Sequence, residues 1–196
     1  MVYKIIISFF FVCTAVLPQT KETLYYLSTD IGLGYSRFVT NSSTENLNKN
    51  GFSGTFRITW HPEHLLSLGL ETGYQQLYSL NTNVTIPKLG TSAAQVSMVT
   101  VPIFIIFSMK IFPQSLPNFE IKFGSGIFLL YNNGEVFGNE LNSSLLSIGA
   151  SIGATYLHPL NDFISIGGEL RYSNISKIQN ADLSLQFMFS YKFLHW

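Results

Sequence analysis

The sequence predicts an all-β protein, an eight-stranded antiparallel up-and-down transmembrane β-barrel, from two observations: regular alternation of side chains and a scarcity of charge. The alternation is clearest near the C-terminus. There, residues 183–193 place a large apolar side chain at every second position, mostly with small or polar residues between. Because strand side chains point to opposite faces with a period of two, one face of this strand meets an apolar phase and the other a polar, narrow space.

The composition points the same way. Charged residues make up 11% of the chain, against about 25% in ordinary soluble domains. Apart from a shorter run at the very start, no segment has the roughly 18 consecutive apolar residues that a membrane-spanning helix needs, so strands carry the membrane signal. The 11 basic residues balance the 11 acidic ones, and the absence of a basic run gives nucleic acid no electrostatic surface to bind.

The N-terminus is typical of an export signal, so we expect residues 1–20 to be a cleaved signal peptide and residues 21–196 to form a single barrel domain. Lys4 supplies the positive charge, and the apolar run after it is too short to span a membrane. Attachment of a lipid to Cys13 is the alternative, but Val12 stands where lipoprotein signals need a small residue. The rest of the chain has no cysteine, so its hydrogen-bond ladder must hold it together.

Eight alternating segments follow, separated by clusters of Gly, Asn, Pro and Ser that are typical of turns. The segments are residues 27–38, 52–60, 66–78, 96–108, 119–131, 145–156, 163–174 and 183–193. In the first three, a bulky apolar face opposes a face of Gly, Ser and Thr. The bulky face holds Leu27, Ile31, Leu33 and Tyr35, then Phe52, Phe56, Ile58 and Trp60, then Leu66, Leu68, Leu70 and Tyr74.

The fourth segment matches the pattern least well, because both of its faces are largely apolar. The outward set is Val99, Val101, Ile103, Ile105 and Phe107, and the inward set is Met98, Thr100, Pro102, Phe104 and Ile106. Pro102 has no backbone N–H for the ladder, so it predicts a bulge at this point.

The last four segments return to the clear alternation of the first three. Their bulky faces hold Phe119, Ile121, Phe123, Ile127 and Leu129, then Leu146, Ile148, Ile152 and Tyr156, then Ile164, Ile166, Leu170 and Tyr172, and finally Leu183, Leu185, Phe187, Phe189, Tyr191 and Phe193. Phe128 and Met188 belong to the inward sets, and with Met98 and Phe104 they should fill the bore.

Alternation alone does not say which face is inside, since a secreted soluble lipocalin-like barrel has the same period with its faces exchanged. The small residues of the polar face suit a crowded lumen, whereas a face in water would be rich in Lys and Glu. The apolar face therefore meets lipid, and its aromatic residues should form two interfacial girdles. One is Tyr26, Trp60, Phe119, Tyr156, Phe163 and Tyr191, and the other Tyr35, Phe52, Tyr78, Tyr131 and Tyr172.

Connection lengths give the orientation. The long polar connections alternate with short ones, and we expect the long ones to be extracellular loops and the short ones periplasmic turns. The long ones are residues 39–51, 79–95, 132–144 and 175–182, and the short ones residues 61–65 and 158–162. Residues 109–118 form a longer periplasmic connection with two prolines. We therefore expect the protein to be a monomer in outer-membrane lipid that binds an unknown protein or glycan through its outer loops.

Four acidic and four basic residues share the inward face. They are Asp30, Glu71, Glu120 and Glu169 with Arg57, Lys122, Arg171 and Lys192. A lone buried charge is very costly, so balanced signs in a narrow lumen predict a structural network of ion pairs. A proton or ion path is the alternative, which the small bore of eight strands disfavours.

A catalytic or metal site is not predicted. His61 and His64 have a spacing that could hold a metal, but ordinary turn histidines are the better interpretation, and no cofactor is expected. A lipid A-modifying barrel enzyme is the other alternative. Deacylases of that type place a His two residues before a Ser-Asn pair, and here Arg171 precedes Ser173 and Asn174, which leaves the serine without a base.

Three segments carry a resemblance to a known family. They are the Val-Pro strand at residues 100–110, the Gly-x-Gly strand at residues 119–131 and the Arg-Tyr strand at residues 170–175. In these the chain resembles the outer-membrane β-barrel family of Bacteroidetes-type bacteria, which includes PorT-like and OmpA-like eight-strand barrels. The resemblance implies an outer-membrane location and, by analogy alone, a PorT-like role in protein secretion. Thr100 and Ile106 depart from the acidic and basic residues usual in the family at these positions.

Overall fold

The computed structural model describes residues 25–40, 47–63, 65–86, 90–136 and 139–195. The predicted signal peptide, residues 1–20, lies outside the described residues. Within the described part, no helix is long and apolar enough to cross a membrane.

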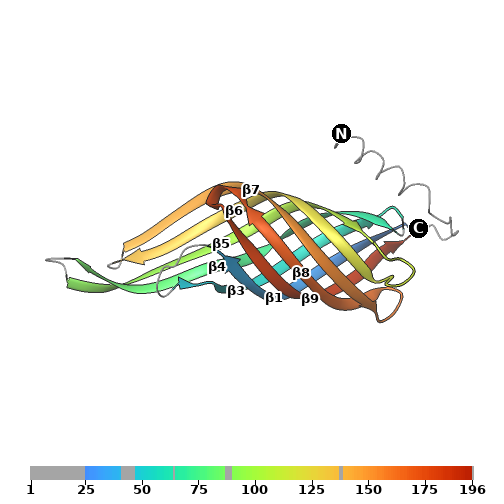
Figure 1. Cartoon of the computed structure of the whole chain (residues 1–196), viewed down its shortest axis with the longest axis horizontal. Coiled ribbons are helices and arrows are strands. Elements are labelled where there is room, and N and C mark those ends of the chain that lie inside the picture. Colours follow the sequence, from blue (N-terminus) through green and yellow to red (C-terminus); the bar gives the residue numbers. More distant parts are fainter. Residues whose placement is uncertain (1–24, 41–46, 64, 87–89, 137–138, 196) are drawn as a thin grey trace, which may run out of the picture.

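Eight long strands form one closed antiparallel ring, and Figure 1 shows this barrel from the side. They are β1 (Tyr26–Val39), β3 (Asn50–His61), β4 (Leu66–Ile86), β5 (Gly90–Met109), β6 (Phe119–Val136), β7 (Asn139–Pro159), β8 (Ile164–Ile175) and β9 (Asn180–His195). Each pairs with the next along the chain, and β1 pairs with β9 to close the ring. A short strand, β2 (Leu47–Asn48), pairs with β4. The predicted eight-stranded up-and-down barrel is confirmed.

The two faces of the ring divide as the alternation predicts. Large apolar side chains are exposed around the whole outside, among them Leu33, Phe56, Ile58, Leu70, Ile105, Ile148, Ile152, Leu170, Leu185 and Phe187. The buried side chains inside are mostly Ser, Thr, charged residues and a few large apolar ones. Since an apolar belt of this extent does not suit water, the lipocalin-like alternative with exchanged faces is wrong.

Two of the predicted girdle residues point into the lumen instead. Tyr26 stacks on the ring of His61, with 4.0 Å between the ring centroids, and Tyr78 packs against Phe38. Tyr26 lies two and four residues before the inward Ser28 and Asp30 in a strand whose β1–β3 ladder has no shift, so it shares their face. For Tyr78 the cause is a register shift between Gln76 and Tyr78 in the β4–β5 ladder. At Leu77 the extra residue turns the following side chains to the other face. Trp60, Tyr156, Phe163, Tyr191, Tyr35, Phe52, Tyr131 and Tyr172 are exposed as predicted.

The bulge predicted at Pro102 is absent from the described ladders. The β4–β5 register is the same on both sides of Pro102, since Ile103 pairs with Thr72 and Thr100 with Gln75. On the other side, Pro102 pairs with Phe128 without a shift. The missing N–H is therefore accommodated by a local gap in one ladder, and the bulge of this strand pair lies at Leu77 instead.

Two of the predicted extracellular loops are mostly strand. The β4–β5 ladder continues to the pair Ile86–Gly90, and the β6–β7 ladder to the pair Val136–Asn139. These extensions project far beyond the barrel (Figure 1). We call them the outer blade: residues 79–86, 90–97, 132–136 and 139–144. Their Asn- and Ser-rich composition predicts loops, but continued pairing satisfies the backbone hydrogen bonds of these residues as well.

The short connections lie at the opposite end, near the point where the described chain begins and ends (Figure 1). We call the two ends of the barrel the turn end and the blade end. At the turn end, the side chain of Asn161 accepts hydrogen bonds from the backbone N–H groups of Phe163 and Ile164, which fixes the β7–β8 turn. The longer β5–β6 connection is held by the N–H of Leu116, which donates to Phe112. At the blade end, a 3-10 turn (Ser176–Ile178) joins β8 to β9.

Candidate functional site in the barrel lumen

Arg57 is the centre of a buried ion-pair network. Its guanidinium is only 1% exposed and contacts three carboxylates from three other strands. Nη2 lies 2.6 Å from Oε2 of Glu71 and 3.0 Å from Oε2 of Glu169, and Nη1 lies 3.5 Å from Oδ2 of Asp30. The ladders explain two of these contacts, because Asp30, Arg57 and Glu71 are direct partners in adjacent strands.

Two more cations complete the network from the other side of the lumen. Arg171 donates to Glu71 and to Glu169, and Lys122 Nζ lies 3.3 Å from Oε2 of Glu169. Thr155 Oγ1 donates to the same Glu169 oxygen at 2.8 Å. Three cations therefore face three carboxylates, so the network is neutral and most of its charged atoms are hydrogen-bonded.

The structure brings together six of the eight inward charges named from the sequence: Asp30, Arg57, Glu71, Lys122, Glu169 and Arg171. The other two, Glu120 and Lys192, make no ion pair with a described residue. Both line a cavity at the turn end instead, where the ammonium of Lys192 lies 4.9 Å from the centre of the Tyr26 ring.

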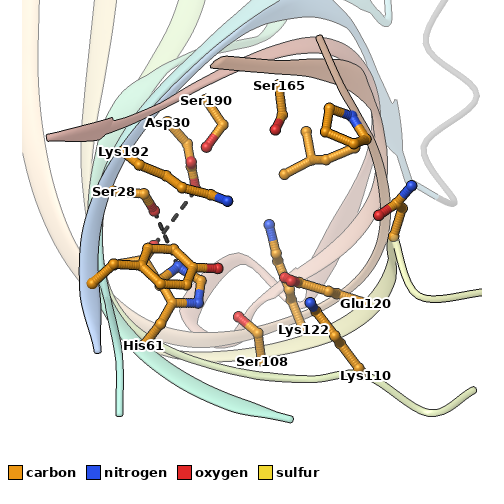
Figure 2. A pocket seen from close by; sticks show the side chains of 15 residues that line it. Ser28, Asp30, His61, Ser108, Lys110, Glu120, Lys122, Ser165, Ser190 and Lys192 are labelled. Atoms are coloured by element: carbon orange, nitrogen blue, oxygen red, sulfur yellow. Dashed lines mark hydrogen bonds between the residues drawn. The ribbon is translucent and has the colours of Figure 1, made fainter. Parts of the chain in front are cut away.

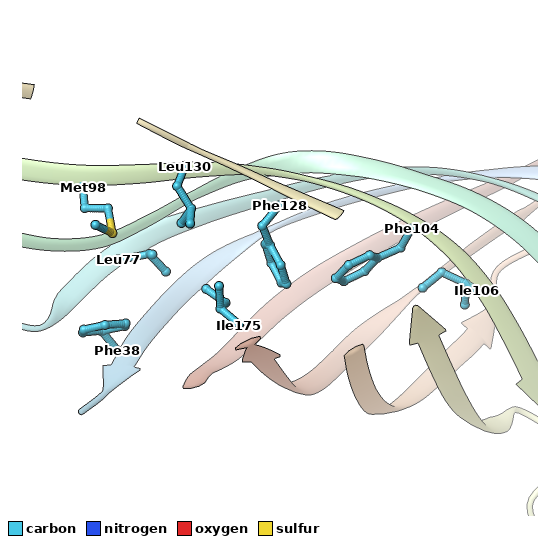
Figure 3. Close-up of a cluster of buried hydrophobic side chains, with 8 residues drawn as sticks. All are labelled: Phe38, Leu77, Met98, Phe104, Ile106, Phe128, Leu130 and Ile175. Atoms are coloured by element: carbon cyan, nitrogen blue, oxygen red, sulfur yellow. The ribbon is translucent and has the colours of Figure 1, made fainter. Parts of the chain in front are cut away.

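Beyond the network, toward the blade end, apolar side chains fill the bore. This plug, shown in Figure 3, consists of Phe38, Leu77, Met98, Phe104, Ile106, Phe128, Leu130 and Ile175. Phe104 and Phe128 meet edge to face with 4.9 Å between centroids, a favoured aromatic geometry. Glycine makes room for them: a Cβ on Gly149 would lie 2.4 Å from the Phe128 ring. Met98, Phe104, Phe128 and Met188 are all buried, as the sequence predicts.

Two cavities flank these layers. One, of about 160 Å³, lies at the turn end between Tyr26, His61 and the three lysines Lys110, Lys122 and Lys192 (Figure 2). The other, of about 330 Å³, lies at the blade end above the plug and is lined by Phe38, Tyr78, Met98 and their neighbours. Along β1 the order is Tyr26, Asp30 and Phe38, so the network and the plug stand in series between the two cavities.

Of the alternative sites named from the sequence, the deacylase-type serine can be placed in the structure, whereas the His61–His64 pair lies partly outside the described residues. Ser173 is buried in the lumen opposite Asp182, with no described histidine in contact, and so does not face lipid as a deacylase serine must. His61 stacks on Tyr26 and lies 3.1 Å from Ser28 Oγ, whereas His64 lies outside the described residues. Among described residues, no group of three His, Cys, Asp or Glu side chains could hold a metal.

No protein-family model and no curated protein matches this chain. Solved structures do match. Two crystal structures of Ail, the attachment invasion locus protein of Yersinia pestis, have TM-scores of 0.58 and 0.57, and the first is a complex with the heparin analogue sucrose octasulfate. Each is 12% identical and covers 86% of this chain and 99% of Ail. Neisserial surface protein A has a TM-score of 0.46 at 12% identity, over 88% of this chain and 98% of its own.

At 12% identity the likeness to Ail shows a shared fold. The closed ring, the apolar outer belt and the filled lumen define the same class independently. The chain is a small membrane-spanning β-barrel of the outer-membrane type, with a lumen closed by a charge network and an apolar plug.

Proposed function

We propose that this protein is a non-enzymatic outer-membrane barrel whose outer blade binds a protein or glycan outside the cell. The observation that carries the proposal is the blade itself, a four-stranded extension in which most of the side chains that the structure describes are exposed. The barrel acts as an anchor in outer-membrane lipid, reached through the predicted signal peptide, and it holds the blade as a monomer. The proposed binding involves no cofactor and no nucleic acid.

The chemistry of the blade supports a polar partner. Direct cross-strand partners share a face, so Asn81, Gln95, Glu135 and Glu140 form one row across four strands. The amide groups in this row can donate hydrogen bonds to, and accept them from, sugar hydroxyls or peptide groups, and the carboxylates can accept them. Apolar side chains are few on the described part of this surface, with the exposed Leu141 as an exception.

One edge of the blade also supports a protein partner. From residue 139 to residue 146, β7 pairs with β6 alone among the described strands, because the β7–β8 ladder begins only at the pair Gly149–Ile175. Along such an edge, alternate backbone N–H and C=O groups have no strand partner. An extended segment of another protein can add there as a further strand.

A finer assignment is part of the proposal. The Val-Pro, Gly-x-Gly and Arg-Tyr strands support membership of the Bacteroidetes-type barrel family, and a PorT-like contribution to protein secretion is the analogous role. Of the alternatives, the lipid A-modifying enzyme is disfavoured by the buried position of Ser173.

Membrane insertion can be tested on the full chain expressed in bacteria. We expect it to fractionate with the outer membrane and to migrate faster on a gel before boiling than after, because a closed ladder resists detergent. Recovery of the mature chain as a soluble monomer without detergent would reject the membrane assignment.

The role of the blade can be tested by shortening both hairpins, so that Leu80 is joined by a two-residue turn to Val96, and Tyr131 to Ser144. The barrel ladder extends to these pairs, so we expect the heat-dependent gel shift to persist while binding to extracellular protein or glycan is lost. An epitope tag between residues 137 and 138 should be labelled on intact cells, whereas one between residues 113 and 114 should need permeabilised cells. Labelling in the reverse order would contradict the orientation.

A further inference from the structure

The cavity at the turn end has features that neither the plug nor the blade explains. Its walls come from the ends of several strands, and Figure 2 shows ammonium and hydroxyl groups directed toward one open space. Its volume of about 160 Å³ is several times larger than the roughly 30 Å³ that one water molecule occupies in the liquid. The cavity can therefore hold a small polar ligand.

The charges that line this cavity are not balanced. Lys122 and Asp30 also line it, but both belong to the neutral network through Glu169 and Arg57. Among the other lining residues there are two cations, Lys110 and Lys192, and one carboxylate, Glu120, so the lining has a surplus of one positive charge. Within the described chain, neither Lys110 nor Lys192 forms an ion pair. A site with one unmatched cation in a partly enclosed space favours an anion.

Hydroxyl groups surround the same space. Ser108 is 1% exposed, and its Oγ has no hydrogen-bond partner among the described residues. Ser165 and Ser190 are buried and face each other across the β8–β9 ladder. Because a buried hydroxyl without a partner costs free energy, Ser108 is a donor that a ligand can satisfy.

Asp30 adds a feature that discriminates between anions. Its Oδ2 accepts hydrogen bonds from Arg57 and Thr59. The residue is only 4% exposed, and its Oδ1 is buried without a hydrogen-bond partner among the described residues. A carboxylate oxygen is only an acceptor, so it requires a ligand that carries a hydrogen. Inorganic phosphate carries one near neutral pH, and a phosphomonoester carries one below its second pKa of about 6, whereas sulfate carries none.

We propose that the turn-end cavity binds a hydrogen-bearing phosphate group, either inorganic phosphate or a phosphomonoester. The ammonium groups of Lys110 and Lys192 neutralise it, the hydroxyl of Ser108 donates to it, and the free oxygen of Asp30 accepts its hydrogen. This site is separate from the outer blade, so it does not depend on the function proposed for the blade. In the orientation proposed above, it opens to the periplasm.

The test is calorimetric titration of the refolded mature chain in a phosphate-free, non-ionic detergent at about pH 5.5, where a phosphomonoester also carries a hydrogen. Inorganic phosphate and glycerol 3-phosphate are the two probes, and the tighter one shows whether the group is free or carried on a larger molecule. We expect sulfate to bind at least about tenfold more weakly than the tighter probe, because Asp30 then faces an oxygen without a hydrogen.

Variants locate the site. Lys110→Gln and Lys192→Gln should each weaken phosphate binding by about tenfold or more, through the loss of a charge-assisted hydrogen bond. Lys177→Gln is the matched control, because Lys177 is exposed in the 3-10 turn at the blade end and should leave binding unchanged. The gel shift on boiling verifies that each variant is folded. Undetectable binding of both probes at millimolar concentration, equal affinity for sulfate, or an equal loss in Lys177→Gln would each overturn the proposal.

Discussion

Replacement of Arg57 by Met should lower the free energy of unfolding by roughly 3 to 5 kcal/mol, because it leaves buried charge uncompensated. Arg57 contacts Asp30, Glu71 and Glu169, and its removal leaves three buried carboxylates with two remaining cations. Methionine fills much of the volume, so the loss comes from uncompensated charge. Urea unfolding in detergent, followed by tryptophan fluorescence and by gel mobility, measures the change.

Two further variants separate charge from packing in this experiment. Arg37→Met removes an arginine that is exposed on the same barrel, and we expect a change within about 0.5 kcal/mol. Addition of Glu71→Gln to Arg57→Met removes one surplus carboxylate and should restore part of the lost stability. A loss below about 1 kcal/mol in Arg57→Met, or no recovery in the double variant, would mean that the lumen hydrates these groups.

The network also shows how far the sequence leads. Alternation with a period of two places Asp30, Arg57, Glu71 and Glu169 on the inward face, because a residue's face depends only on its parity along the strand. The contact of Arg171 with Glu71, 100 residues apart, could not be predicted in this way. It depends on the stagger of the closed ring, which brings distant strands to the same height across the lumen.

Bulges mark the opposite limit. One extra residue in a strand exchanges its two faces, and little in the local sequence announces it. Tyr78 was therefore predicted to lie in an outer girdle but packs inside against Phe38, whereas Pro102, the residue that did suggest a bulge, keeps its register. The outer blade was missed for a related reason. Asn- and Ser-rich stretches are typical of loops, and only pairing with neighbouring strands makes them β-structure.

The last prediction concerns conduction. In planar bilayers we expect at most small, irregular currents from the intact protein, because the lumen is closed twice along its length. The plug closes it at Phe104 and Phe128, and the network closes it at Arg57 and its partners. Because the two closures lie in series, a variant that opens one of them should still be closed by the other.

Phe128→Ala removes the centre of the plug but leaves the network intact, so we expect the barrel to remain closed to ions. This substitution should cost about 3 to 5 kcal/mol, so folding must be verified by the gel shift on boiling before currents are recorded. Steady channels in Phe128→Ala would show that the network does not seal the bore. Large steady channels in the unaltered protein, comparable to those of sixteen-stranded porins, would reject the closed lumen altogether. Diffusion through the barrel, rather than binding at the blade, would then be the leading function.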